Sequence, residues 1–419
     1  MATLFRGGRL LDGTGAEPHD ADVLVRDGAV AEVGANLPVG DAAVEEVPGC
    51  TIIPGLIDCH THITKGNAVG EANAWQDADT LPTEREAGFL VGLDGGVQDA
   101  LAGARFAART LSAGFTTVRD VGGGRRYSDI ALREAVARGF VTGPRILASG
   151  GGIAMTGGHA WGMGFVEADG ADEVRRVTRQ QLKAGADVIK LVASRAGGTA
   201  VAQGAPELSV DEMRAACIEA HLQGRRVCAH AISAESIKNA VEAGVDTIEH
   251  GCLADQEALE MMAARGRYLI CTLLPYYNQA HLAREQGYPD DVSAPSLSLM
   301  ERYPQVVREA LSLGVPVALG SDCGIWQLTP HGTNASELQM VVELCGVSPA
   351  RAIELATAAG ARALALEDVT GVVAAGKSAD LLVVEGDPTA DISLLCRAES
   401  IRAVVMAGVT HHAGAMHRR

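Results

Sequence analysis

The middle of this 419-residue chain alternates between short apolar runs, rich in β-branched residues, and longer segments with helical periodicity. The apolar runs are predicted to be strands, at 51–60, 115–120, 145–150, 187–194, 225–230, 246–250, 268–273 and 315–322. The periodic segments are predicted to be helices, at 97–113, 128–138, 172–184, 211–222, 233–243, 255–264 and 298–313. Such alternation forms parallel β/α units. A closed eight-stranded barrel and an open doubly wound sheet both fit it.

The two ends of the chain have a different texture. Residues 1–50 and 371–410 consist of short alternating runs that are broken by Gly and Asp-Gly turns. Two β-rich ends around a β/α middle predict one small β-domain built from both termini. We expect it at 1–53 and 368–419, with the β/α domain at 54–367, a division that suits a chain of this length.

Composition excludes several function classes. The chain carries 52 acidic and 35 basic residues, a formal charge of −17, which disfavours nucleic acid and anionic membranes as partners. It has no apolar run of 18 residues or more, so we expect no membrane span, and its start lacks a secretory h-region. Nine scattered cysteines without a CxxC pair are typical of a reducing cytoplasm rather than of a disulfide framework.

Side chains that suit a metal centre stand at or near the carboxyl ends of the predicted strands. They are His60, His62, Lys190, His230, His250 and Asp322. In a (β/α)8 TIM barrel these strand ends meet at one mouth, where active sites are built. An open sheet would spread the same residues along a line too long for one site. Their positions therefore favour the barrel and a metal site together.

Neither the His-x-His pair nor the single histidines would be decisive alone. His60 and His62 are two apart on a strand, so both rings point to one face and can bind one ion. A lone strand histidine such as His230 or His250 is more often a core residue. Asp322 ends an apolar strand that has no other reason to finish in an acid. Accidents at four strand ends together are improbable, so the set predicts a metal site.

Lys190 lies inside an apolar strand, where an unpaired ammonium is costly. One alternative is that its side chain extends to the barrel mouth or forms a salt bridge. The other is that CO₂ carboxylates it to a carbamate that can bridge two cations. The residue alone leaves both open; the other five ligands favour the carbamate, because two metals need a bridging anion. Two metals sharing a water generate hydroxide near neutral pH, and Asp322 can carry the proton to a leaving amine. The predicted chemistry is hydrolysis of a C–N bond.

These motifs resemble the amidohydrolase superfamily, above all its binuclear branch of Xaa-Pro and Xaa-Arg dipeptidases (prolidases), with imidazolonepropionase-like and ochratoxin-hydrolysing relatives. The matching stretches are 54–62, 114–123, 156–159, 187–194, 228–231, 244–251, 318–324 and 371–388. The resemblance implies that His60, His62 and Asp322 hold one metal, His230 and His250 the other. It also implies a carboxylated Lys190, zinc as the metal, an accessory β-sandwich at the termini and a homo-oligomer.

Further residues near the predicted mouth are candidate substrate contacts. They are His159, Arg195, Tyr276 and His331. Arg195 could pair a substrate carboxylate in a bidentate manner, although a surface arginine, a loop histidine and a core tyrosine are the ordinary alternatives. Asn334 could support the site from behind. The long connection at 66–95 is expected to act as a lid.

One departure from the resemblance affects the substrate. Dipeptide-cleaving relatives often carry a tyrosine two residues after the fifth-strand histidine, where this chain has Ile232. We expect amide hydrolysis in a small N-acyl amino acid or dipeptide-like substrate; the alternative is a carbamate, urea-type or cyclic amide compound. Lys190 argues against a mononuclear deaminase. A non-catalytic scaffold would be expected to lack ligands.

Overall fold

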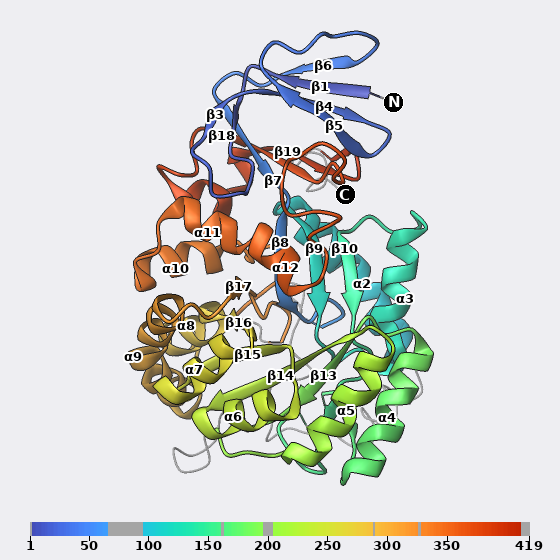
Figure 1. Ribbon diagram of the computed structural model, residues 1–419, viewed down its shortest axis with the longest axis vertical. Helices are drawn as coiled ribbons and strands as arrows, with labels where there is room; N and C mark the ends of the chain where they lie inside the picture. The colour runs from blue at the N-terminus through green and yellow to red at the C-terminus, as the bar shows by residue number, and fades with distance from the viewer. Residues whose placement is uncertain are drawn as a thin grey trace.

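The computed structural model describes residues 2–65, 95–160, 163–195, 204–287, 290–325 and 328–411. Figure 1 shows two regions: strands from both ends of the chain gather at one end, where the N- and C-termini also lie, and the β/α middle fills the rest. The expected lid at 66–95 falls almost wholly outside the described residues, which resume at Gly95.

The named strands that the structure describes in the middle all pair in parallel. They are β8 (Leu56–Thr61), β9 (Phe115–Asp120), β10 (Arg145–Ala148), β11 (Ile153–Ala154), β12 (Val166–Glu167), β13 (Val188–Val192), β14 (Arg226–Ser233), β15 (Thr247–Leu253), β16 (Tyr268–Cys271) and β17 (Val317–Leu319). Every pair among them is parallel, in the orders β10-β9-β8 and β12-β11-β13-β14-β15-β16-β17. The α/β class predicted from the alternation is therefore observed.

Hydrogen bonds also connect the edges of these two parallel sheets. A parallel bridge joins Thr61, at the end of β8, to Cys323 just after β17. Asp322 N donates to His60 O at 2.8 Å beside it. Asp187, just before β13, also donates its N–H to Ala148 O at the end of β10, at 2.8 Å. The first and last alternating strands thus lie side by side, which brings their carboxyl ends together.

Helices separate most of the strands. They are α2 (Gly95–Ser112), α3 (Ser128–Ala137), α4 (Ala171–Ala184), α5 (Val210–Leu222), α6 (Ala234–Ala243), α7 (Gln256–Ala264), α8 (Leu273–His281), α9 (Asp290–Ser312), α10 (Ser336–Cys345), α11 (Pro349–Leu355) and α12 (Ala358–Ala363). Side-chain caps at Ser209, Ser233 and Asp255 satisfy first-turn N–H groups, and left-handed Gly185 and Gly244 end two helices. None of them is both long and apolar enough to cross a membrane, as far as the described residues go.

The ends of the chain form two further sheets. Their strands are β1 (Ala2–Arg6), β2 (Arg9–Leu10), β3 (His19–Asp20), β4 (Asp22–Arg26), β5 (Ala29–Gly34), β6 (Ala43–Glu46), β7 (Cys50–Pro54), β18 (Leu381–Glu385), β19 (Ile401–Met406) and β20 (Val409–His411). The sheet orders are β5-β4-β1-β6 and β20-β19-β18-β7-β2-β3. One buried cluster joins Val23 and Ile52 to Leu381 and Val405. Residues from both termini therefore share a core, as expected.

Two expectations need correction. The run 51–60 is not one strand: β7 pairs with β18 and β2, whereas β8 pairs with β9. Gly55 lies between the two strands. A Cβ at this position would lie 2.2 Å from Thr116 Oγ1, so the close packing of the backbone against Thr116 requires glycine. No helix was predicted between 274 and 297, whereas α8 and the start of α9 lie in this stretch. Pro295 lies inside α9, where a proline ordinarily breaks a helix.

Candidate metal centre

Three of the predicted ligands converge where β8 meets the chain after β17. Asp322 Oδ1 lies 3.4 Å from His60 Nε2 and 3.2 Å from His62 Nε2. All three residues are buried, and their candidate ligand atoms lie within 4.8 Å of one another. The His-x-His spacing on one strand and the bridge to β17 produce this geometry directly.

The outer ring nitrogens of both histidines are already engaged. His62 Nδ1 lies 2.7 Å from Gly122 O, which can only accept, so Nδ1 carries the proton. His60 Nδ1 lies 2.6 Å from the Glu249 carboxylate. When unprotonated, both Nε2 atoms therefore turn lone pairs toward Asp322 Oδ1, a buried oxygen with no hydrogen-bond partner among the described residues. Electron-rich atoms that face one another in a buried space fit a bound cation.

A buried ion pair lies behind His60. Arg119 Nη2 donates to Glu249 Oε1 at 2.8 Å, Nη1 to Thr247 Oγ1 at 3.0 Å and Nε to Cys59 O at 2.7 Å. Burial alone would raise the pKa of Glu249, but Arg119 and His60 hold that pKa well below its usual range. Glu249 therefore fixes the ring of His60 as a carboxylate. Our sequence reasoning missed this pair; a charged residue inside each of two apolar strands was the available signal.

The second histidine pair lies next to the first. The ring centroids of His230 and His250 are 4.6 Å apart, and those of His60 and His250 4.7 Å. His250 Nδ1 lies 2.7 Å from Thr272 Oγ1, and His230 Nε2 is buried with no hydrogen-bond partner in the described part of the chain. Burial lowers the pKa of both imidazoles well below the ordinary value, which favours the neutral form that binds metals.

Backbone strain marks two of these residues. His250 has φ 70° and Asp322 φ 54°, in the left-handed region that non-glycine residues rarely adopt. In β15 this departure from the extended form allows both Glu249 and the next residue, His250, to serve the site. Alternation along a regular strand would send these two neighbours to opposite faces.

Lys190 lies on β13 and is 3% exposed. In the parallel register it pairs with Cys228, two residues before His230 on β14. Within the described part of the chain its ammonium makes no hydrogen bond or ion pair, and burial lowers its pKa. Of the alternatives that the sequence left open, the described residues supply no salt bridge to this ammonium, and its carboxylation stays a prediction.

Comparisons with known proteins identify the family of this chain. The model of the amidohydrolase family matches residues 51–410. The chain belongs to the amidohydrolase family. Ochratoxinase from Aspergillus niger is 28% identical over 97% of this chain and 86% of its own length. Imidazolonepropionase from Deinococcus radiodurans is 26% identical over 93% of this chain and 92% of its own.

Solved structures give the same answer. A Xaa-Pro dipeptidase crystallised with methionine in its active site has a TM-score of 0.84, with 30% identity and coverage of 98% of this chain and 100% of that one. The predicted superfamily and branch are confirmed, and such neighbours imply a TIM-barrel-type α/β fold. The chain is an enzyme, a hydrolase of C–N bonds, in a family that is generally metal-dependent.

In this amidohydrolase two of the predicted substrate contacts lie beside the histidines. The His159 ring is 4.7 Å from that of His230, and burial, then Lys190, lowers its pKa to about 4. Tyr276 is buried with its ring 5.8 Å from that of His250. Both therefore border the candidate metal centre.

Arg195 and His331 are placed differently. Arg195 is 43% exposed and its Nε lies 3.2 Å from Glu207 Oε1. His331 is buried beneath the His-x-His segment, where Nε2 donates to His62 O at 3.1 Å and Lys65 O at 2.8 Å, and its ring stacks on Phe106. His331 thus holds the backbone after the first two ligands.

A further buried acid ties β8 to the segment that carries Asp322. Asp58 accepts from Ser321 N at 2.9 Å, Ser321 Oγ at 2.5 Å and Asn334 Nδ2 at 2.8 Å. It also accepts from His60 N at 3.1 Å. Asn334 therefore supports the site from behind, as expected, whereas Asp58 was not predicted from the sequence.

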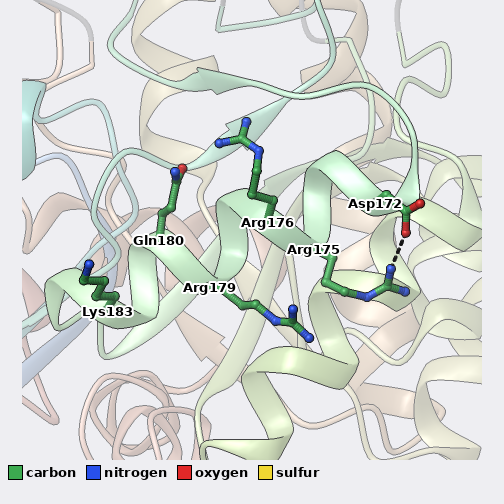
Figure 2. A pocket seen from close by; sticks show the side chains of 6 residues that line it. All are labelled: Asp172, Arg175, Arg176, Arg179, Gln180 and Lys183. Atoms are coloured by element: carbon green, nitrogen blue, oxygen red, sulfur yellow. Dashed lines mark hydrogen bonds and ion pairs between the residues drawn. The ribbon is translucent and has the colours of Figure 1, made fainter.

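A pocket of about 460 Å³ lies elsewhere, along the outer face of α4 (Figure 2). Its lining residues are Asp172, Arg175, Arg176, Arg179, Gln180 and Lys183. Ion pairs with acidic neighbours neutralise much of the positive charge that lines this pocket. Arg175 contacts Asp172 at 2.5 Å, and Arg179 contacts Glu219 at 2.8 Å. No candidate ligand lines it, so this pocket is separate from the chemistry.

Proposed function

We propose that this amidohydrolase cleaves the amide C–N bond of a small N-acyl amino acid or dipeptide-like substrate with two divalent metal ions, zinc being the simplest choice. The observation that carries the proposal is the convergence of the two Nε2 atoms of His60 and His62 on Asp322 Oδ1, next to the second histidine pair. When the rings are neutral, a bound cation would relieve the repulsion among these buried lone pairs.

Each ligand has a role in this proposal. His60, His62 and Asp322 would hold one ion, and His230 and His250 the other. Lys190, as a carbamate formed with CO₂, would bridge them, which its burial without a hydrogen bond or ion pair supports. Two such ions, when bound, lower the pKa of a shared water and polarise a carbonyl group.

The chain's own groups would move the proton and hold the substrate. Asp322 faces the space between the histidines and would take a proton from the attacking water and return it to the leaving amine. Arg195 is half exposed and would pair the free carboxylate of the substrate. His159 and Tyr276 would border the reacting amide.

The domain organisation is also part of the proposal. The hydrogen bonds that join β8 to the end of β17 support a closed (β/α)8 barrel over 54–367. The shared core of the terminal sheets supports a composite β-sandwich at 1–53 and 368–419. All nine cysteines are free, which supports a reducing, cytoplasmic setting. We propose a homo-oligomer by the family resemblance.

One observation favours a second candidate, hydrolysis of a carbamate, urea-type or cyclic amide compound. Ile232 is fully buried, and its backbone N–H donates to Ser194 Oγ at 2.9 Å. The position after His230 where a tyrosine would contact a dipeptide carbonyl therefore offers no polar side chain. A substrate that depends less on that contact would fit this chain.

A substrate screen tests the proposal. Metal-loaded enzyme is given N-acyl amino acids and dipeptides in parallel with carbamates, ureas and cyclic amides. We expect turnover of the first group, lost with Asp322→Ala and weakened with Arg195→Ala only where the substrate has a free carboxylate. Turnover confined to the second group favours the alternative, and full turnover by Asp322→Ala contradicts both.

A further inference from the structure

Glu207 connects two of the candidate substrate contacts and has no assigned role. Its carboxylate accepts from His159 N with both oxygens, at 2.8 and 2.9 Å, and lies 3.2 Å from Arg195 Nε. The Glu207 side chain is 3% exposed, against 43% for Arg195. One buried acid thus fixes the loop that carries His159 and one edge of the arginine.

The backbone around Glu207 is held firmly. The chain at 193–195 runs antiparallel to 204–207, with a bridge between Ser194 and Pro206, and Glu207 N donates to Ala193 O at 2.9 Å. Ser194 Oγ in turn accepts from Ile232 N on β14. Arg195 therefore pairs with Ala205 and Ala193 with Glu207, so Arg195 and Glu207 are diagonal neighbours on two antiparallel segments next to the strand that carries His230.

Gly158 explains why the loop can lie against this carboxylate. A Cβ at this position would lie 2.8 Å from Glu207 Oε2 and 2.7 Å from Met155 Cγ. A side chain at 158 would displace the Glu207 carboxylate or the Met155 side chain from these positions. The second glycine of the TGGH motif thus has a packing reason that depends on Glu207.

The geometry leaves part of the guanidinium available. Glu207 takes Nε, and Nη2 lies 3.5 Å from Gly157 O, whereas Nη1 has no partner among the described residues. The terminal Nη1–Nη2 edge can present two parallel N–H groups, the arrangement that binds a carboxylate in a bidentate manner. A half-exposed arginine without an anchor would sample many rotamers instead.

We propose that Glu207 is a positioning residue that orients Arg195 and His159 and thereby gives this amidohydrolase its preference for substrates with a free carboxylate. This inference rests on the proposed function. Glu207 does not touch the substrate in this account. It acts through the guanidinium edge on one side and through the His159 backbone on the other.

Kinetics on matched substrates test the inference. N-acetyl amino acids and their carboxamides, which lack the charge, are given to metal-loaded wild type, Glu207→Gln and Gly158→Ala. Both variants should raise KM for the acids by about tenfold or more and KM for the carboxamides much less, because the carboxamides use His159 but not the guanidinium edge, and both should change kcat little. Arg195→Ala should show the same pattern, and Glu207→Gln should add little to it.

Glu167→Gln is the matched control, because Glu167 accepts from Gly157 N on the same loop at 2.8 Å from the exposed side. Its KM values should equal those of wild type. A fall in KM for the acids in Glu207→Gln would show that the carboxylate repels the substrate rather than positions its partner. Equal losses on acids and carboxamides would show a structural role only. Either result overturns the inference.

Failure of the proposed function is separately visible. If wild type cleaves neither N-acyl amino acids nor dipeptides, the reaction assigned above is wrong. Calorimetric binding of N-acetylphenylalanine then decides the inference: wild type should bind it about tenfold more tightly than Glu207→Gln, and equal affinities overturn it.

Discussion

At the scale of single residues, the candidate site depends on buried groups that orient its histidines. Glu249 holds the His60 ring and is itself held by Arg119, so three fully buried residues act as one unit. Partners of metal-binding histidines fix the tautomer and the ring orientation, and their loss lowers metal affinity by about 10–100-fold. Gly122 O orients the ring of His62 in the same way, because it accepts a hydrogen bond from His62 Nδ1.

The variant Glu249→Gln tests this unit. We expect metal affinity to fall within that range, because the neutral amide cannot hold His60 as the carboxylate does, while Arg119 is left as a buried charge without its counterion. Competition with a chromogenic chelator measures the affinity. Glu257→Gln is the control, since Glu257 is exposed and pairs with Lys238. Unchanged affinity in Glu249→Gln would contradict the role assigned to this carboxylate.

The positions of the candidate ligands follow from the strand ends that the sequence reveals, whereas the partnership of Arg119 with Glu249 does not. Arg119 and Glu249 are 130 positions apart and meet only through the sheet. Neither the left-handed backbone of His250 nor that of Asp322 leaves a local sequence signal. These features of the site depend on non-local pairing and on backbone strain, which hydrophobic periodicity in the sequence does not reveal.

At the scale of secondary structure, α8 depends on a residue from α10. Glu337 accepts from Leu273 N at 2.8 Å and Leu274 N at 2.7 Å, which satisfies two N–H groups of the first turn of α8. Because this cap comes from 64 residues further along the chain, α8 carries no local start signal. This is one reason why no helix was predicted between 274 and 297.

The same carboxyl predicts a pH effect on stability. Burial raises the pKa of Glu337 from 4.5 to about 7. Because the folded state binds the proton more tightly than the unfolded state, protonation of Glu337 stabilises the fold. This contribution to the free energy of unfolding, about 3 kcal/mol, is fully present below pH 4.5 and is lost as the pH rises through 7. Urea unfolding of metal-free protein at pH 5 and pH 8 should show this loss.

Comparison between variants isolates Glu337, because burial also raises the pKa of Asp120 to about 7 and that of Asp129 to about 6. Glu337→Gln should show a smaller loss between pH 5 and pH 8 than wild type. Glu343→Gln, at an exposed position on the same helix, should behave as wild type. Identical pH dependence in all three proteins would refute the assignment.

At the scale of the whole molecule, the candidate ligands come from strands spread between β8 and β17, so a bound metal would link distant parts of the fold. Anything that binds only the folded state stabilises it, by about 4 kcal/mol at 1,000 times its dissociation constant. Removing metal from wild type should therefore lower the melting temperature by several degrees. Calorimetric scans with and without a chelator measure this, and His60→Ala should respond much less. A chelator without effect on wild type would count against a metal that spans these strands.

The central claim is that two cations bind among these strand ends, and anomalous diffraction from crystals of zinc-loaded protein tests it most directly. We predict two peaks about 3.5–4 Å apart, one within about 2.2 Å of ligand atoms of His60, His62 and Asp322 and the other at the same distance from His230 and His250, with Lys190 between them. Crystals with full zinc loading that show no peak at these residues, or Lys190 turned away from them, would contradict the account.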